Sequence, residues 1–108
     1  MRKVEFPHSV REQLLEGTAN AVLSGQRTLA WAENVSAWFE RQYRRFQSRS
    51  FVRLRRLGRS QQYFLGVFSD ENNRVLDRRI GSVRCRICFR LNASENLVEV
   101  LHIDFEDL

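Results

Sequence analysis

The strongest constraint on the fold of this chain is the alternation of side-chain type from residue 83 to residue 91. Apolar side chains occupy every second position there, and arginines occupy three of the positions between them. A period of two is typical of a β-strand with one buried face. The polar segment Asn92–Asn96 follows, and then a second apolar-rich run from Leu97 to Phe105. A short polar break between two such runs predicts an antiparallel β-hairpin.

The register of this hairpin follows if Leu91 pairs with Leu97. The apolar face would then consist of the pairs Phe89 with Glu99, Ile87 with Leu101, Cys85 with Ile103, and Val83 with Phe105. The other face would carry the pairs Arg84 with Asp104, Arg86 with His102, and Arg90 with Val98. Side chains opposite each other on one face lie close enough to interact. Two interpretations of this polar face remain open: a solvated face with one ion pair, or a surface that binds anions or RNA.

The residues before the hairpin predict a short strand and two helices. Residues 3–6 alternate between charged and apolar types, and Ser9 with Glu12 has the spacing of a capping box that begins a helix. Gly17 should weaken or divide that helix, and Gly25 should end it. Thr28 should cap a second helix that continues to about residue 47. Its apolar face, which we expect in the core, consists of Trp31, Val35, Trp38, Phe39 and Phe46.

The segment between the helices and the hairpin is less regular. Residues 51–57 are compatible with a strand or with a basic connection, residues 61–69 predict a strand, and residues 70–73 have the composition of a turn. The structure of residues 75–82 stays undetermined. The aromatic residues Tyr63, Phe64 and Phe68 are either buried strand residues or exposed rings for stacking on bases.

Residues 1–108 are expected to form a single domain of the α+β class. The order of elements predicts a short N-terminal strand, two helices, and a three- or four-stranded antiparallel sheet with the helices packed on one face. No apolar run approaches the roughly 18 residues that span a membrane, and residues 1–8 lack the apolar core of a signal peptide. We therefore expect a cytoplasmic protein without membrane contacts.

The two cysteines, Cys85 and Cys88, have the spacing of a redox or half-zinc motif. Residues three apart in a strand point to opposite faces, and a second cysteine pair that would complete a zinc site is absent from the sequence. We therefore expect both cysteines to be packing residues, and we expect neither a metal nor a cofactor.

The basic residues are clustered. Of the 18 basic residues only Lys3 is a lysine, and residues 41–60 contain eight arginines without an acid. Five more arginines lie between residues 78 and 90, whereas residues 95–107 contain five acids. Clustered arginines are typical of nucleic-acid-binding proteins, and they serve equally well to bind an acidic protein partner.

Three stretches of the chain, which together extend over nearly its whole length, resemble a known protein family. They are residues 4–14, residues 52–58, and residues 83–91 followed by residues 97–103. These are similar to the strand–helix start, the basic stretch and the paired final strands of the RelE/ParE superfamily, the toxins of bacterial toxin–antitoxin modules. Some members cleave mRNA on the ribosome and others poison DNA gyrase, and each is neutralised by a cognate antitoxin protein.

For the RNA-cleaving members, the resemblance implies a metal-independent endoribonuclease that uses basic side chains to stabilise charge. Arg86 would match their strand arginine, and His102 would be the general acid or base. The expected nucleic-acid-binding residues are Arg53, Arg55, Arg56, Arg84 and Arg90. A nuclease would require Arg84, Arg86, Arg90 and His102 to lie together on one concave face.

The last residues depart from the pattern of the cleaving members. Residues 104–108 are mostly acidic, where those members carry a basic residue and a tyrosine. This is compatible with a gyrase-type toxin, an inactive relative or a different fold. A hypothesis of another class is a non-catalytic, arginine-rich module that binds nucleic acid or protein. Binding that weakens with salt and leaves RNA intact would distinguish it from a nuclease.

Overall fold

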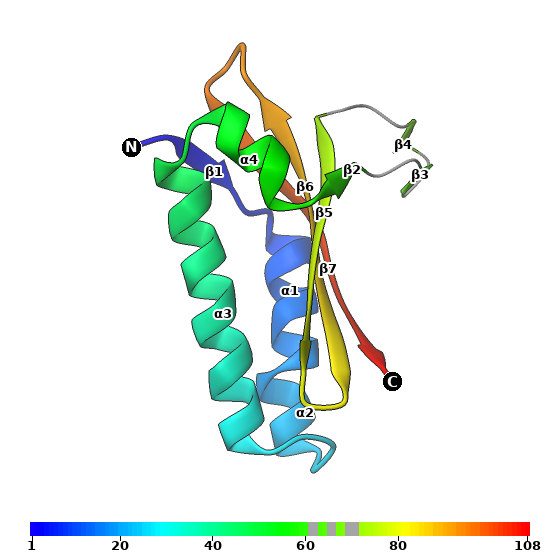
Figure 1. Ribbon diagram of the computed structural model, residues 1–108. Coiled ribbons are helices and arrows are strands. Elements are labelled where there is room, and N and C mark those ends of the chain that lie inside the picture. Colours follow the sequence, from blue (N-terminus) through cyan, green and yellow to red (C-terminus); the bar gives the residue numbers. More distant parts are fainter. Residues whose placement is uncertain (61–62, 65–66, 69–71) are drawn as a thin grey trace.

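The computed structural model describes residues 1–60, 63–64, 67–68 and 72–108 (Figure 1). The elements are, in chain order, β1 (Lys3–Glu5), α1 (His8–Gly17), α2 (Ala19–Leu23), α3 (Leu29–Ser48), α4 (Phe51–Leu57), β2 (Arg59–Ser60), β3 (Tyr63–Phe64), β4 (Val67–Phe68), β5 (Asn73–Ile80), β6 (Val83–Asn92) and β7 (Leu97–Asp107).

The main sheet has the strand order β1-β7-β6-β5-β2, with the helices packed against it (Figure 1). Strand β1 runs parallel to β7, with Val4 opposite Val98, and the other neighbouring strands are antiparallel. This arrangement confirms the predicted α+β class. Within the described ranges, no helix has the length and apolar character needed to cross a bilayer.

The core lies between the helices and one face of the main sheet. Ile87 and Phe89 of β6 are fully buried there, together with Phe46 of α3 and Leu54 of α4. The rings of Phe46 and Phe89 have their centroids 4.7 Å apart. The aromatic face predicted for the second helix is therefore core, and only its first residue, Trp31, is partly exposed.

The ends of the helices follow the sequence signals in part. The Thr28 side chain accepts a hydrogen bond from the Trp31 N–H at 3.2 Å and caps α3, as predicted. The first predicted helix divides after Gly17 into α1 and α2, and Gly25 follows α2 with φ +79°, which suits glycine.

The predicted capping box is wrong, because α1 begins before Ser9. The carbonyl of Pro7 accepts the first helical hydrogen bonds instead.

The predicted register of the hairpin is also wrong. Leu91 lies opposite Val98, because the connecting turn has four residues, 93–96, and begins after Asn92 pairs with Leu97. This one-residue shift moves Glu99 from the core face to the opposite face. A β-bulge between Cys88 and Phe89 leaves Leu101 without a register partner and shifts the pairing once more.

Residues 51–57 form α4, and the expectation of a strand or a connection is wrong. The apolar residues Phe51, Leu54 and Leu57 recur every third position and face the core along one side of a helix. The Ser50 side chain caps α4 by accepting a hydrogen bond from the Arg53 N–H at 3.3 Å.

Most of the predictions for residues 61–73 fall outside the described residues, namely at 61–62, 65–66 and 69–71. The described parts, β3 and β4, pair with each other in a separate antiparallel sheet. The side chains of Tyr63, Phe64 and Phe68 belong to the part of the chain that is not described. The segment left undetermined, residues 75–82, contributes to β5, which pairs with β6 along its whole length.

Candidate functional site

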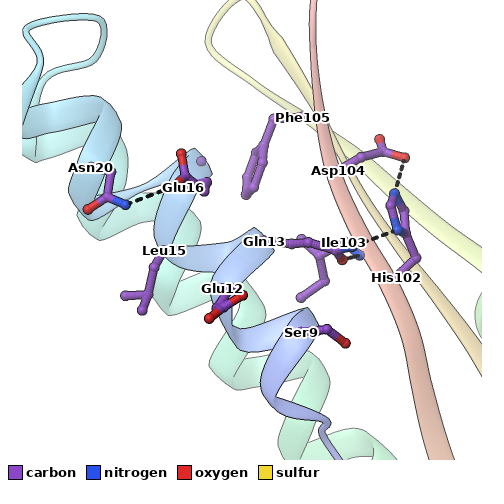
Figure 2. A pocket seen from close by; sticks show the side chains of 11 residues that line it. Ser9, Glu12, Gln13, Leu15, Glu16, Asn20, His102, Ile103, Asp104 and Phe105 are labelled. Atoms are coloured by element: carbon purple, nitrogen blue, oxygen red, sulfur yellow. Dashed lines mark hydrogen bonds and ion pairs between the residues drawn. The ribbon is translucent and has the colours of Figure 1, made fainter.

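A connected set of polar side chains lies on the face of β6 and β7 that points away from the core. We call it the strand cluster, and its members are Gln13, Arg86, His102, Asp104 and Glu106. Three of these residues belong to β7 and one to β6, while Gln13 reaches them from α1 (Figure 2). The strand residues share one face because the register places Arg86 opposite Asp104, one position away from the core pair Ile87 and Ile103.

Arg86 is held by two carboxylates. Its Nε donates to Asp104 Oδ1 at 2.9 Å, and its Nη2 donates to Glu106 Oε2 at 2.5 Å. The hydrogen bond with Asp104 is the main cause of a raised pKa for Arg86, so that the guanidinium stays charged. These bonds engage two of the five N–H donors of the guanidinium, and the negative charge of the two carboxylates weakens its attraction for a phosphate.

His102 has a polar neighbour at each ring nitrogen. Its Nδ1 lies 3.0 Å from Gln13 Nε2, and its Nε2 lies 3.5 Å from Asp104 Oδ2 (Figure 2). The Ile103 N–H donates to Gln13 Oε1 at 2.9 Å, which fixes the orientation of the amide. Gln13 therefore donates through its NH2 group to Nδ1, and a neutral His102 carries its proton on Nε2, facing Asp104.

The position of Gln13 follows from the edge of the sheet. Strand β1 covers β7 only as far as Glu99, and α1 packs beside the remainder of that edge. The Gln13 side-chain oxygen thus accepts the hydrogen bond that the Ile103 N–H would otherwise donate to a carbonyl of a neighbouring strand. The same side chain that protects this edge also orients His102.

A groove of about 780 Å³ lies between α1 and β7, next to the strand cluster (Figure 2). Its lining includes the carboxylates of Glu12, Glu16 and Asp104, whereas arginine and lysine are absent from it. This charge opposes an anionic ligand. The groove therefore does not provide the positively charged cleft that cleavage of RNA needs.

The structure places the four residues of the expected nuclease face on one side of the sheet but does not gather them. Arg84 and Arg90 lie six positions apart on β6, a separation of about 20 Å at about 3.3 Å per residue. Arg84 is opposite Glu106 and Arg90 is opposite Glu99. Arg86 and His102 both contact Asp104, which lies between them.

The other predicted nucleic-acid-binding residues lie on the opposite side of the sheet. Arg53, Arg55 and Arg56 belong to α4, whose Leu54 packs into the helix-covered core. Arg55 turns toward the sheet, where its Nη2 lies 3.5 Å from Asn72 Oδ1.

Arg55 also lies near a second partly buried arginine on β5. Burial and the nearby positive charge of Arg55 lower the pKa of Arg74, which donates to the Gly58 carbonyl. These two side chains therefore hold the junction between α4 and β5 together, and Arg55 is less accessible to a ligand than its neighbours on α4.

Arg53 and Arg56 are exposed and line a groove of about 270 Å³ between α3 and α4. The opposite wall is formed by Arg45 and Arg49, from the last turn and the C-cap of α3. We call these four residues the arginine groove. Among the described residues, none of the four forms an ion pair. The sequence showed that this segment is basic, but the groove became apparent only once residues 51–57 proved to be helical.

The two cysteines lie on opposite faces of β6, as their spacing predicts. Both are buried and free, and Cys85 belongs to the core cluster. Burial raises the pKa of Cys85 to about 11 and that of Cys88 to about 12, which keeps both thiols protonated near neutral pH. In the described part of the chain, no three histidine, cysteine or acidic side chains come together as a metal site.

Comparisons with known proteins gave no match, whether with protein-family models, with curated proteins or with solved structures.

Proposed function

We propose that this chain is a RelE/ParE-like toxin of a bacterial toxin–antitoxin module. Its target would be RNA and translation, through ribosome-dependent mRNA cleavage, or DNA gyrase, and a cognate antitoxin would neutralise it in the cytoplasm. The observation that carries the proposal is the contact of both Arg86 and His102 with Asp104 on the uncovered face of β6 and β7. These are the two residues that the resemblance assigns to catalysis.

The chemistry of a cleaving toxin would require this network to open. A scissile phosphate that displaced Asp104 or Glu106 from Arg86 would leave the full charge of the guanidinium to stabilise the charge that develops on the phosphorus oxygens. His102 would need to release Gln13 or Asp104 before one of its nitrogens could exchange a proton with the substrate. Substrate binding and activation of the site would therefore be the same event.

A second candidate function is nucleic-acid binding without cleavage. The observation that favours it is the state of the strand cluster, in which Arg86 holds two carboxylates and His102 is hydrogen-bonded to Gln13 with Asp104 beside its other nitrogen. Arg53 and Arg56 on α4 form no ion pair with any described residue, and they offer a binding surface that needs no such rearrangement. This module would bind RNA in a salt-dependent manner and leave it intact.

The antitoxin of the first hypothesis has a surface suited to an amphipathic helix. A groove of about 720 Å³ between α1, α2 and α3 has a mostly apolar lining, and Leu15, Leu23 and Leu29 are exposed along it. Leu23 is 86% exposed, and together with its neighbours it forms a contiguous apolar patch of the kind that marks an interaction site. The apolar face of an antitoxin helix would cover these residues in a helix-in-groove mode.

The test is growth after induced expression in a bacterium, with total RNA and translation followed in the same culture. The informative variant is Arg86→Ala, and the matched control is Arg79→Ala, because Arg79 is an exposed arginine of the neighbouring strand β5 to which no role in the site is assigned. Growth arrest with mRNA cleavage that is lost only in Arg86→Ala supports a ribonuclease. Equal toxicity of the wild type and Arg86→Ala would exclude Arg86 as a catalytic residue.

Two further outcomes separate the remaining targets. Growth arrest with intact RNA and continued translation points to gyrase, which a supercoiling assay then checks. Normal growth at verified expression of folded protein contradicts the toxin hypothesis and favours the binding module.

A further inference from the structure

The arginine groove brings together four guanidinium groups from two helices. Arg45 and Arg49 are four residues apart at the end of α3, and Arg53 and Arg56 are three residues apart on α4. Each pair therefore lies on one side of its helix. The short connection between α3 and α4 turns these two sides toward each other, so that all four residues line one groove.

No acidic side chain in the described part of the chain compensates the positive charge of this groove. Arg44, the neighbour of Arg45 on α3, pairs with Glu40 at 2.9 Å and does not line the groove. By contrast, the four groove arginines form no ion pair with any residue that the structure describes, and the lining contains no carboxylate. Four like charges held this close repel each other, and a bound anion would relieve that repulsion.

The groove suits a phosphate better than an acidic protein. Protein partners are usually anchored by apolar side chains at the centre of the interface. The apolar residues of this lining are Leu54, which is fully buried, and Leu57, which is partly buried. The volume of about 270 Å³ is also below the roughly 300–1,000 Å³ of pockets that enclose drug-sized ligands. A phosphate is small, and an arginine can bind it through two parallel hydrogen bonds.

We infer that the arginine groove binds backbone phosphates of single-stranded RNA, at a site separate from the strand cluster. The separation follows from the fold, because α4 packs on the helix-covered face of the sheet and Arg86 projects from the other face. The choice of RNA among phosphate polymers rests on the proposed function, whereas the phosphate site itself does not. An RNA held in the groove would remain bound whatever the state of Arg86 and His102.

The experiment measures the affinity of the whole chain for a fluorescent oligouridylate of about 12 nucleotides at several salt concentrations. The groove variants are Arg45→Gln/Arg49→Gln on α3 and Arg53→Gln/Arg56→Gln on α4. The matched control is Arg41→Gln/Arg44→Gln, which removes two charges from the same helix outside the groove. All six side chains are exposed, and circular dichroism with thermal melting verifies that each variant is folded.

Each groove variant should bind RNA about tenfold more weakly at constant salt. The plot of the logarithm of the association constant against the logarithm of the salt concentration has a negative slope. The magnitude of this slope should fall by about 1.4 in each groove variant, because each of the two lost phosphate contacts on a single strand contributes about 0.7. The control should keep most of both the affinity and the slope. An equal loss in the groove variants and the control would overturn the inference, since it would show a general effect of net charge.

A second readout separates the sources of phosphate. Inorganic pyrophosphate is titrated into labelled protein while the Nε–H resonances of the arginines are followed by NMR. Shifts confined to the groove arginines support the site if RNA produces the same shifts. Pyrophosphate binding without RNA binding overturns the assignment to RNA. A failure of the toxin proposal is recognised separately, as normal growth of cells that express a protein with groove-dependent RNA binding.

Discussion

At the scale of single residues, Asp104 connects the strand cluster. It accepts a hydrogen bond from Arg86 and lies within ion-pair distance of His102, and its side chain is 31% exposed. Ion pairs with this much solvent contact contribute about 0 to 1 kcal/mol each. The cluster therefore determines how Arg86 and His102 are oriented and contributes little to the stability of the fold.

The tautomer of His102 is a direct consequence of this geometry. Neutral His102 should carry its proton on Nε2, because Gln13 donates to Nδ1. Nitrogen-15 NMR of the ring at about pH 8, where an ordinary imidazole is neutral, should show a protonated Nε2 and an unprotonated Nδ1. In Gln13→Leu this preference should weaken. A proton on Nδ1 in the wild type would contradict the assigned orientation of Gln13.

Gly17 is a second residue whose environment determines the effect of a substitution. Helix propensity alone favours alanine over glycine by about 1 kcal/mol. A Cβ at Gly17, however, would overlap the Phe105 ring, which packs edge-on against Trp31 with centroids 6.0 Å apart. We expect Gly17→Ala to lower the free energy of unfolding by about 1–3 kcal/mol in urea denaturation.

The control for this prediction is the same substitution in a Phe105→Ala background. With the ring removed, Gly17→Ala should be neutral or stabilising, as in an ordinary helix. The same loss of stability in both backgrounds would mean that the contact with Phe105 is not the cause.

At the scale of elements, α4 joins the core to the arginine groove. Its Leu54 is fully buried beneath a surface that is otherwise basic, and Ser50 caps its first turn. A seven-residue helix is too short to be stable by itself, so that packing must hold it in place. The geometry of the groove thus depends on the packing of Leu54, with Phe51 and Leu57 beside it, against the core.

We expect Leu54→Ala to lower the free energy of unfolding by about 2–5 kcal/mol, because it leaves a cavity in the core. The matched control is Val52→Ala on the same helix, where the side chain is 57% exposed and the change should remain within about 0.5 kcal/mol. Chemical denaturation measures both variants. If Leu54→Ala and Val52→Ala lowered the free energy of unfolding by similar amounts, the packing of α4 against the sheet through Leu54 would be contradicted.

At the scale of the whole molecule, the charges are divided between two surfaces. The acids of β7 engage arginines nearby: Asp104 and Glu106 hold Arg86, and Asp107 holds Arg27. Among the described residues, the lining of the arginine groove contains no such acids, so four arginine charges are concentrated there between α3 and α4. A field of this kind attracts anionic partners to that side of the molecule.

Unfolding of the whole chain should depend on pH through its two buried thiols. Burial raises the pKa of Cys85 to about 11 and that of Cys88 to about 12, from an ordinary value of 9.0. As the pH rises above about 9, unfolded thiols lose their protons first, and the unfolded state binds fewer protons than the folded state. The free energy of unfolding should therefore fall between about pH 9 and pH 11.

Urea denaturation at a series of pH values from about 8 to about 11 tests this prediction. The control is Cys85→Ala/Cys88→Ala, which should be less stable at about pH 8 but should lose less stability with rising pH. The same pH dependence in both proteins would attribute it to other groups.

The local elements were largely predictable from the sequence. The alternation on β6, the aromatic face of α3, the cap at Thr28 and the break after Gly17 all rest on interactions between residues close in the chain. The spacing of three in residues 51–57 was also present in the sequence, but arginines between the apolar positions masked it. The candidate site was predicted only in part, because Arg86, His102 and Asp104 were placed on one face but Asp104 was paired with Arg84, and Gln13 and Glu106 were not identified.

The sequence by itself determined the fold class, the buried face of the hairpin strand β6 and the presence of a basic surface, because periodicity and composition act locally. Only the tertiary structure decided which charges remain uncompensated. Ion pairs such as Arg86 with Asp104, and the meeting of Arg49 with Arg53 in one groove, depend on the register of the hairpin and on the packing of α4. A single shifted residue or one bulge changes those pairings, and neither follows from local pattern.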